Sequence, residues 1–238
     1  TAAFVANANL SRYFNYHQGF DEYVEMWRRE RGPARERQWD TAERVTEKSI
    51  DWLSRQRSRK FFLWVHYVDP HTPYNPPPPY DTMFVGDRHA NRYEELALDK
   101  IKPQHRVGDS RDPDLYVARY DGEIRFVDSQ IEILLAKLDE LGLRDNTLLI
   151  FTSDHGESFV ENDLIFDHGY YAYDNCAHVP LIIRYPGRHL AGQASNEVVS
   201  LVDVLPTILA DANLPVPGGI HGENLSAIMT DIESMWPR

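Results

Sequence analysis

An aspartate and a histidine stand side by side directly after an apolar run of this 238-residue sequence. Asp154 and His155 follow Thr147–Thr152 and precede Gly156. A carboxylate oxygen and an imidazole nitrogen are both ligands of divalent cations, and glycine permits the tight turn that lets both side chains face one ion. A structural alternative stays open, in which Asp154 caps a following turn and His155 only packs.

Two further histidines are candidates for the same site. His71 comes shortly after the apolar run Lys60–Val68, and His168 lies in the segment Phe166–Gly169. Ligand-binding groups of open α/β sheets gather where the strands end at their carboxyl side. We therefore predict that Asp154 and His155 bind one cation, and that this cation faces His71 and His168.

Apolar periodicity predicts the elements that must position these residues. Short continuous apolar runs indicate strands covered on both faces, and apolar residues at helical spacing indicate helices. The predicted strands are Thr1–Ala6, Lys60–Val68, Thr147–Thr152 and Val179–Tyr185, and the predicted helices are Thr41–Gln56, Asp112–Gly142 and Val202–Asn213, the last broken near Pro206. Asp40 and Glu43 resemble a capping box for the first helix. Strand, helix and strand in this order predict a mostly parallel sheet.

The connecting segments are predicted to be loops. Asn7–Glu25 is irregular and rich in aromatic residues, whereas Arg28–Arg37 is a solvated loop because Glu30 and Glu36 interrupt its basic residues. His71–Tyr80 is rich in proline, which cannot donate the hydrogen bonds of a sheet, so a rigid extended loop is expected. A PxxP docking motif is the alternative for that loop.

Composition excludes several classes of partner. The net charge of −12 and the pI near 5.2 disfavour nucleic acid and anionic membranes, which clustered lysine and arginine bind. An anionic substrate would therefore need a local source of positive charge in its binding site, such as a bound cation or inward-facing histidines. The single cysteine, Cys176, excludes an internal disulfide and a cysteine-rich zinc site. No stretch approaches the ~20 apolar residues of a membrane helix, so no transmembrane segment is expected.

Five segments resemble, in order and spacing, successive blocks of the sulfatase family, which belongs to the alkaline phosphatase superfamily. They are Phe61–Tyr74, Tyr120–Ile131, Thr147–Glu157, Asp167–Gly187 and Ser200–Leu209. The resemblance implies an α/β fold, with an alkaline phosphatase-like, mostly parallel sheet flanked by helices. It also implies that residues 1–238 form a single, partial catalytic domain of a sulfuric ester hydrolase.

The same resemblance implies residue roles. Asp154 and His155 match the metal-binding pair of the family, with Ca²⁺ as the expected cation and Mn²⁺ or Zn²⁺ as alternatives. His71 matches a histidine that hydrogen-bonds the sulfate group. His168 matches a residue that contacts the ester oxygens, and its imidazole could protonate a leaving alcohol near neutral pH. The expected substrate is a small-molecule or saccharide sulfate ester, and an exported location, periplasmic or extracellular, is favoured.

The sequence departs from the family pattern at both ends. The family's C/S-x-P-S-R motif, whose Cys or Ser becomes formylglycine, and an acidic pair that completes the metal site are expected before Thr1. A smaller C-terminal subdomain is expected after Leu225. We therefore interpret the chain as a fragment, and expect it to show no turnover of an aryl sulfate by itself.

Several residues keep alternative interpretations. His66 is expected to be structural rather than a ligand, and Glu157 either hydrogen-bonds a ligand residue or faces water. Cys176 lacks the context of a nucleophile. A phosphodiesterase, phosphonate monoester hydrolase or phosphoethanolamine transferase of the same superfamily would need the same Asp154 and His155, and a non-catalytic binding domain is a further alternative.

Overall fold

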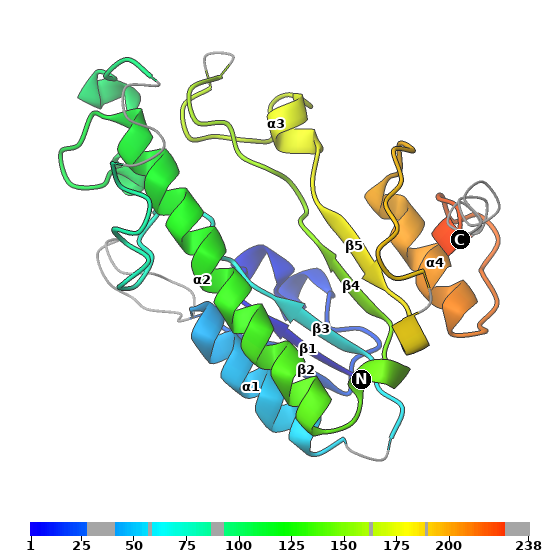
Figure 1. Ribbon diagram of the computed structural model, residues 1–238. Coiled ribbons are helices and arrows are strands. Elements are labelled where there is room, and N and C mark those ends of the chain that lie inside the picture. Colours follow the sequence, from blue (N-terminus) through cyan, green and yellow to red (C-terminus); the bar gives the residue numbers. More distant parts are fainter. Residues whose placement is uncertain (28–40, 57–58, 87–92, 162–163, 189, 227–238) are drawn as a thin grey trace. The chain divides into compact units, whose positions relative to one another are not determined.

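The computed structural model describes residues 1–27, 41–56, 59–86, 93–161, 164–188 and 190–226 (Figure 1). The chain divides into two compact units. The larger unit comprises Thr1–Leu143 and Glu157–Cys176, and the smaller unit comprises Arg144–Gly156 and Ala177–Arg238. Each unit is described by itself below.

A parallel sheet of three strands forms the base of the larger unit. Its strands are β1 (Ala2–Val5), β2 (Glu22–Glu25) and β3 (Leu63–His66), in the order β2-β1-β3. Val5 pairs with both Glu25 and His66, so the carboxyl ends of all three strands lie at one edge. The loops that follow these strands therefore start from the same edge of the sheet.

Burial in this sheet differs from the sequence prediction. All four residues of β1 are buried, as expected, because β1 lies between the other two strands. The residues of β3 are only partly buried, so the expectation of a strand fully covered on both faces is wrong there. β2 was not predicted from the sequence, because Asn7–Glu25 was expected to be irregular. Its short, charge-flanked sequence carries no apolar run, and its pairing with β1 makes it a strand.

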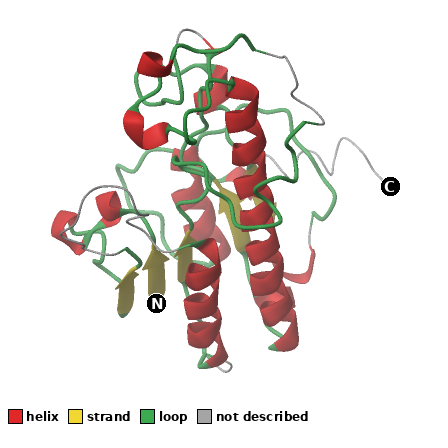
Figure 2. Cartoon of the chain, turned by 90° about the vertical axis from the view of Figure 1, so that its left-hand side faces the viewer, coloured by secondary structure: helices red, strands yellow, loops and turns green. Residues whose placement is uncertain are grey.

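Two long helices pack beside each other in the larger unit. They are α1 (Ala42–Ser54) and α2 (Pro113–Glu140), and α1 also contacts β1 and β3 (Figures 1 and 2). Both confirm the predicted helices. The side chain of Asp112 caps α2 by accepting from the Asp114 N–H, and proline occupies the first helical position, where no backbone donor is needed.

The start of α1 differs from the predicted capping box. Asp40 lies outside the described residues, and the N-cap residue is Thr41, whose side chain makes no capping hydrogen bond. Instead the buried carboxylate of Asp69, which follows β3 in the chain, accepts from the Ala42 N–H at 3.1 Å. A carboxylate at a helix N-terminus is favoured by the helix dipole, so Asp69 joins the end of β3 to α1.

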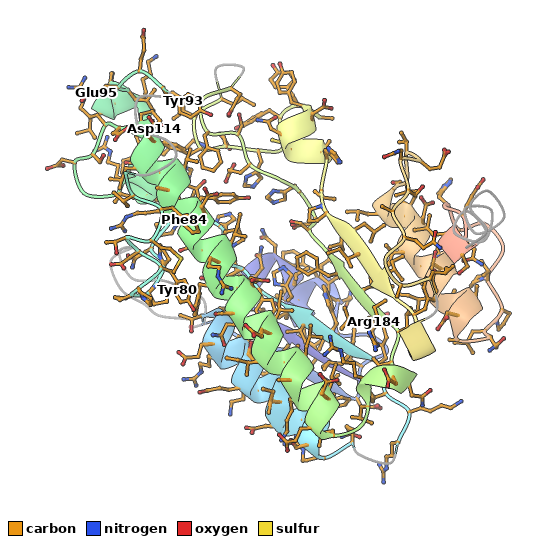
Figure 3. All side chains as sticks on the ribbon, viewed as in Figure 1. Tyr80, Phe84, Tyr93, Glu95, Asp114 and Arg184 are labelled. Carbon is orange, nitrogen blue, oxygen red and sulfur yellow. The ribbon has the colours of Figure 1, made fainter. Side chains whose placement is uncertain are left out.

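The proline-rich loop lies along α2, in agreement with the predicted extended loop. The buried carboxylate of Glu123 accepts from the Asn75 N–H at 2.7 Å. At Gly122 a Cβ atom would lie 2.3 Å from the carbonyl oxygen of Tyr80, which Figure 3 shows beside the helix. Only glycine permits this approach, so α2 positions the loop that carries His71.

An aromatic cluster fills the core between this loop and the chain around residue 166. Its fully buried members are Tyr74, Ile101, Tyr116 and Phe166. The rings of Tyr116 and Phe166 stack with their centroids 4.3 Å apart, and Tyr74 meets Phe166 edge-on at 6.3 Å. Burial of such rings stabilises the loops that carry the histidines.

The smaller unit contains a two-stranded antiparallel sheet. β4 (Leu149–Thr152) pairs with β5 (Leu181–Arg184), so both predicted strands are confirmed in type, although they are partly exposed. Arg184, labelled in Figure 3, forms an ion pair with Asp145 at 2.8 Å. The chain then enters α4 (Val204–Asp211) after a turn of 3₁₀ helix, Leu201–Asp203.

The predicted break near Pro206 is two residues too late. The helix changes type between Asp203 and Val204, and Pro206 lies inside the first turn of α4, where the missing N–H costs nothing.

The other short helices in the described ranges are α3 (Asp174–Ala177) and the 3₁₀ turns Ala8–Leu10, Arg12–Phe14, Leu98–Lys100, Pro103–His105, Arg144–Asn146 and Pro186–Arg188. Among the helices that the structure describes, none has the length and apolar character to cross a membrane.

Candidate active site

A short antiparallel bridge brings two residues of the predicted site region together. Ser158 pairs with Asp167, each N–H donating to the other's carbonyl at 3.2 and 3.1 Å. The hydroxyl of Ser158 also donates to the carbonyl of Glu161, which closes the loop on itself. Because Glu157 and His168 flank the bridge, its register places them opposite each other.

Glu157 contacts His168 and Tyr74 rather than water. Its side chain is 6% exposed. One carboxylate oxygen, Oε1, lies 3.2 Å from His168 Nδ1, and the other, Oε2, accepts from the Tyr74 hydroxyl at 3.0 Å. The alternative of a water-facing carboxylate is therefore wrong. Glu157 contacts His168, a predicted ester-binding residue, whereas hydrogen bonding to a metal ligand stays a prediction.

His71 lies against the ring of His168. Their ring centroids are 5.7 Å apart, and the planes meet at 75°. His71 Nδ1 lies 2.7 Å from the carbonyl oxygen of Thr72, so that nitrogen donates to the backbone. The structure thus brings together the two histidines that the sequence singled out for ester binding, although their role toward an ester stays a prediction.

Charged neighbours surround this histidine pair. Lys102 Nζ forms an ion pair with Asp167 at 2.5 Å. Burial works against ionisation of Asp167, but hydrogen bonds from Lys102 and from the His168 N–H lower the pKa of its carboxyl group overall. Burial lowers the pKa of His105, and the charge of Lys102 lowers it further, against the opposing effect of nearby carboxylates.

Sequence reasoning missed Tyr74, Lys102 and His105 as neighbours of the histidine pair. Tyr74 belongs to a block that matched the family, but its contact is with Glu157, a residue far along the chain. Lys102 and His105 lie in a segment without any motif, and no local pattern indicates their place. Burial, followed by the negative charge of Glu157, raises the pKa of the Tyr74 hydroxyl far above its usual range, so Tyr74 is a neutral donor.

The predicted metal pair belongs to the smaller unit. Asp154 comes after the end of β4, with its side chain 74% exposed, and its Oδ2 lies 3.8 Å from His155 Nε2. His155 Nδ1 lies 2.7 Å from the carbonyl oxygen of Gly156. That backbone acceptor favours the tautomer with hydrogen on Nδ1, which leaves the lone pair on Nε2, as a metal ligand requires.

The geometry of this pair fits a shared cation. Metal–nitrogen and metal–oxygen bonds of about 2.0–2.5 Å allow one ion to contact two atoms separated by 3.8 Å. Within the described ranges, no group of three or more His, Cys, Asp or Glu side chains is arranged to hold a metal ion. Asp154 and His155 could therefore supply two ligands of a larger set.

The two remaining residues with alternative interpretations have contacts in the larger unit. His66 lies within β3, partly buried, with its ring edge-on to Trp64 at 6.2 Å. Cys176 is buried, and burial raises the pKa of its thiol, which disfavours the reactive thiolate. Both observations agree with structural roles. Convergence of Asp154 and His155 with His71 and His168 stays a prediction.

Comparison with known proteins identifies a family model, relatives and solved structures that are similar to this chain. A family model described as Sulfatase matches residues 2–214. The chain is 32% identical over 209 residues to an arylsulfatase of Clostridium perfringens, covering 81% of this chain and 42% of that protein. It is 30% identical over 190 residues to an ulvan-active sulfatase of Formosa agariphila, covering 78% and 35%. Among solved structures, a phosphonate monoester hydrolase of Agrobacterium radiobacter has a TM-score of 0.68 at 27% identity, covering 81% and 43%.

The chain therefore belongs to the sulfatase family, as its motifs indicated. Its α/β fold, with a parallel sheet and flanking helices, is of the alkaline phosphatase-like class. The chain spans less than half the length of these relatives. Membership in this family also points to use of a divalent metal.

Proposed function

We propose that this chain contributes the ester-binding histidines and part of the metal site of a sulfuric ester hydrolase. The supporting observation is the contact between His71 and His168, whose ring centroids lie 5.7 Å apart. Hydrolysis breaks the sulfur–oxygen bond of the ester, and water supplies the oxygen of the sulfate and the hydrogen of the released alcohol.

His71 and His168 would have different roles toward the ester. His71 donates from Nδ1 to the Thr72 carbonyl, so its Nε2 is the nitrogen that would face the sulfate oxygens. His168 pairs through Nδ1 with Glu157, so its Nε2 would deliver a proton to the leaving alcohol oxygen. A positioned histidine acting as a general acid typically contributes about 10²–10⁴-fold to the rate.

Asp154 and His155 would hold the cation in this proposal. The position of both residues after β4 and the contact of His155 Nδ1 with the Gly156 carbonyl, which favours hydrogen on Nδ1, support this assignment. When bound, a divalent cation would neutralise the non-bridging oxygens of the ester. The exposed carboxylate of Asp154 favours a hard cation such as Ca²⁺, and Mn²⁺ and Zn²⁺ are the alternatives.

A phosphonate monoester is the second candidate substrate. The similarity to the phosphonate monoester hydrolase of Agrobacterium radiobacter supports it, and such an enzyme would need the same Asp154 and His155. The arylsulfatase similarity favours the sulfate ester, either of a small molecule or of a saccharide. We further propose that residues 1–238 belong to a single catalytic domain, of which they form a part, and that the protein is exported, as the family resemblance implies.

Parallel assays test the proposal. The protein expressed from its complete reading frame would be given 4-nitrophenyl sulfate and a 4-nitrophenyl phosphonate with Ca²⁺, Mn²⁺ or Zn²⁺. We expect faster turnover of 4-nitrophenyl sulfate than of the phosphonate, and loss of Ca²⁺ binding by calorimetry for Asp154→Ala. The general acid is tested with an alkyl sulfate, whose leaving alcohol needs a proton, and His168→Ala should lose at least about 10²-fold in kcat for that ester. His178→Ala, an exposed histidine outside the site, is the matched control and should leave both readouts unchanged.

Three results would count against the proposal. Faster turnover of the phosphonate would favour the second candidate. Undiminished turnover of the alkyl sulfate in His168→Ala would contradict the assignment of His168 as the general acid. Ca²⁺ binding that survives the loss of Asp154 would contradict the metal assignment.

A further inference from the structure

We propose that Glu157 and Tyr74 form a positioning pair that holds His168 in one orientation and one tautomer. This inference rests on the proposed function of His168 as the general acid, and it assigns to Glu157 and Tyr74 a role that neither the motifs nor the comparisons indicate. The three residues are connected by two hydrogen bonds, of 3.2 and 3.0 Å.

The carboxylate determines which nitrogen of His168 carries hydrogen. An ionised carboxylate only accepts hydrogen bonds, so the short contact between Glu157 Oε1 and His168 Nδ1 requires hydrogen on Nδ1. The two ring nitrogens point in different directions, and Nε2 is therefore turned away from Glu157. In the neutral ring, Nε2 then has the lone pair that can take up a proton for the leaving alcohol.

Tyr74 holds the carboxylate in place. Its hydroxyl donates to Glu157 Oε2, and its ring is fully buried in the aromatic cluster. Tyr74 stays a neutral donor at any ordinary pH because its pKa lies far above the usual range. The carboxylate therefore has one oxygen bound on each side and cannot rotate without breaking a hydrogen bond.

The backbone gives the third constraint on this arrangement. The bridge between Ser158 and Asp167 fixes the positions of Glu157 and His168 on either side of it. The ring of His71 packs edge-on against His168 and limits ring rotation from another direction. A nearly buried carboxylate is costly without such partners, and here both of its oxygens have one.

Nitrogen NMR tests the tautomer directly, without any need for turnover. The protein would be labelled with ¹⁵N-histidine, and the His168 signals assigned by their loss in His168→Asn. At a pH high enough that the ¹⁵N shifts of His168 no longer change with pH, we expect one tautomer with hydrogen on Nδ1. Glu157→Leu, which cannot accept a hydrogen bond, should give signals averaged between the two tautomers.

Control variants keep this test decisive. Tyr120→Phe removes a hydroxyl from the same aromatic cluster, and should leave the His168 tautomer unchanged. If Glu157→Leu does not fold, Glu157→Gln replaces it, and the Nδ1–H proton signal should then shift upfield or disappear because a charge-assisted hydrogen bond is lost. A wild-type His168 with hydrogen on Nε2, averaged wild-type signals, or variants at Glu157 with unchanged signals would overturn the proposal.

Kinetics separate a positioning role from a purely structural one. In the protein expressed from its complete reading frame, Glu157→Gln should lower kcat for an alkyl sulfate by about 10–100-fold, with KM unchanged. The kcat for 4-nitrophenyl sulfate should fall less than about 3-fold, because its leaving group needs no proton. Equal losses for both esters would indicate a structural role only. If the wild type hydrolyses neither ester, the proposed function fails, and the NMR result still decides the positioning by itself.

Discussion

Replacing Tyr74 with phenylalanine removes one hydroxyl from the core and leaves the ring in place. Tyr74 is fully buried, and its hydroxyl donates to the carboxylate of Glu157 at 3.0 Å. Without this donor, Glu157 Oε2 loses its hydrogen bond. Water cannot easily replace it, because the Glu157 side chain is only 6% exposed. The substitution should therefore destabilise the folded protein.

The expected magnitude follows from the type of hydrogen bond. A hydrogen bond to a charged group contributes about 1.5–3 kcal/mol to the free energy of unfolding, so about 2 kcal/mol is expected to be lost. For an m-value of about 3 kcal/mol per M urea, the unfolding midpoint should fall by about 0.7 M.

Urea unfolding followed by tryptophan fluorescence measures this shift. Tyr120→Phe is the matched control, because Tyr120 meets Tyr74 edge-on in the same cluster and its hydroxyl makes no hydrogen bond to any residue that the structure describes. The control should change the free energy of unfolding by less than about 0.5 kcal/mol. Equal midpoints for the wild type and Tyr74→Phe, or a loss as large in the control, would refute the reasoning.

Two further predictions concern packing and pH. Gly122→Ala places a methyl group 2.3 Å from the Tyr80 carbonyl oxygen and should cost about 1–3 kcal/mol of unfolding free energy, whereas the exposed Ile124→Ala should cost less than about 0.5 in the same urea assay. Burial raises the pKa of Tyr67 from 10.0 to about 12. The folded state therefore holds more protons than the unfolded state in that range, and stability should fall as pH rises through it, by about 2–3 kcal/mol. Tyr67→Phe should reduce this fall, and an identical pH dependence in the variant would contradict the assignment.

Local sequence patterns predicted the helices and most of the strands. The apolar spacing of α2 and the capping residue Asp112 are local signals, so its bounds agree with the prediction within two residues. β2 has no such signal, because its four residues become a strand only through pairing with β1. The capping of α1 by Asp69 could not be predicted from a local pattern either, because the two partners of that hydrogen bond lie 27 positions apart in the sequence.

The candidate site was predictable in its residue types but only partly in its contacts. His71 and His168 were found from their motifs, and the structure places their rings against each other. Glu157 was found as a residue of interest, but its partners were not, because Tyr74 lies 83 positions away from it. Lys102 and His105 carried no signal at all, as their relevance depends only on which carboxylates and imidazoles surround them.

The sequence by itself determined the family, the order of the elements and the histidines and carboxylates available for chemistry, because motifs and apolar periodicity are properties of neighbouring residues. Only the tertiary structure decided that Glu157 is buried between Tyr74 and His168. Hydrogen bonding and burial at that carboxylate depend on side chains from three separate segments. Such an environment forms when the chain folds, and it has no counterpart in any local pattern.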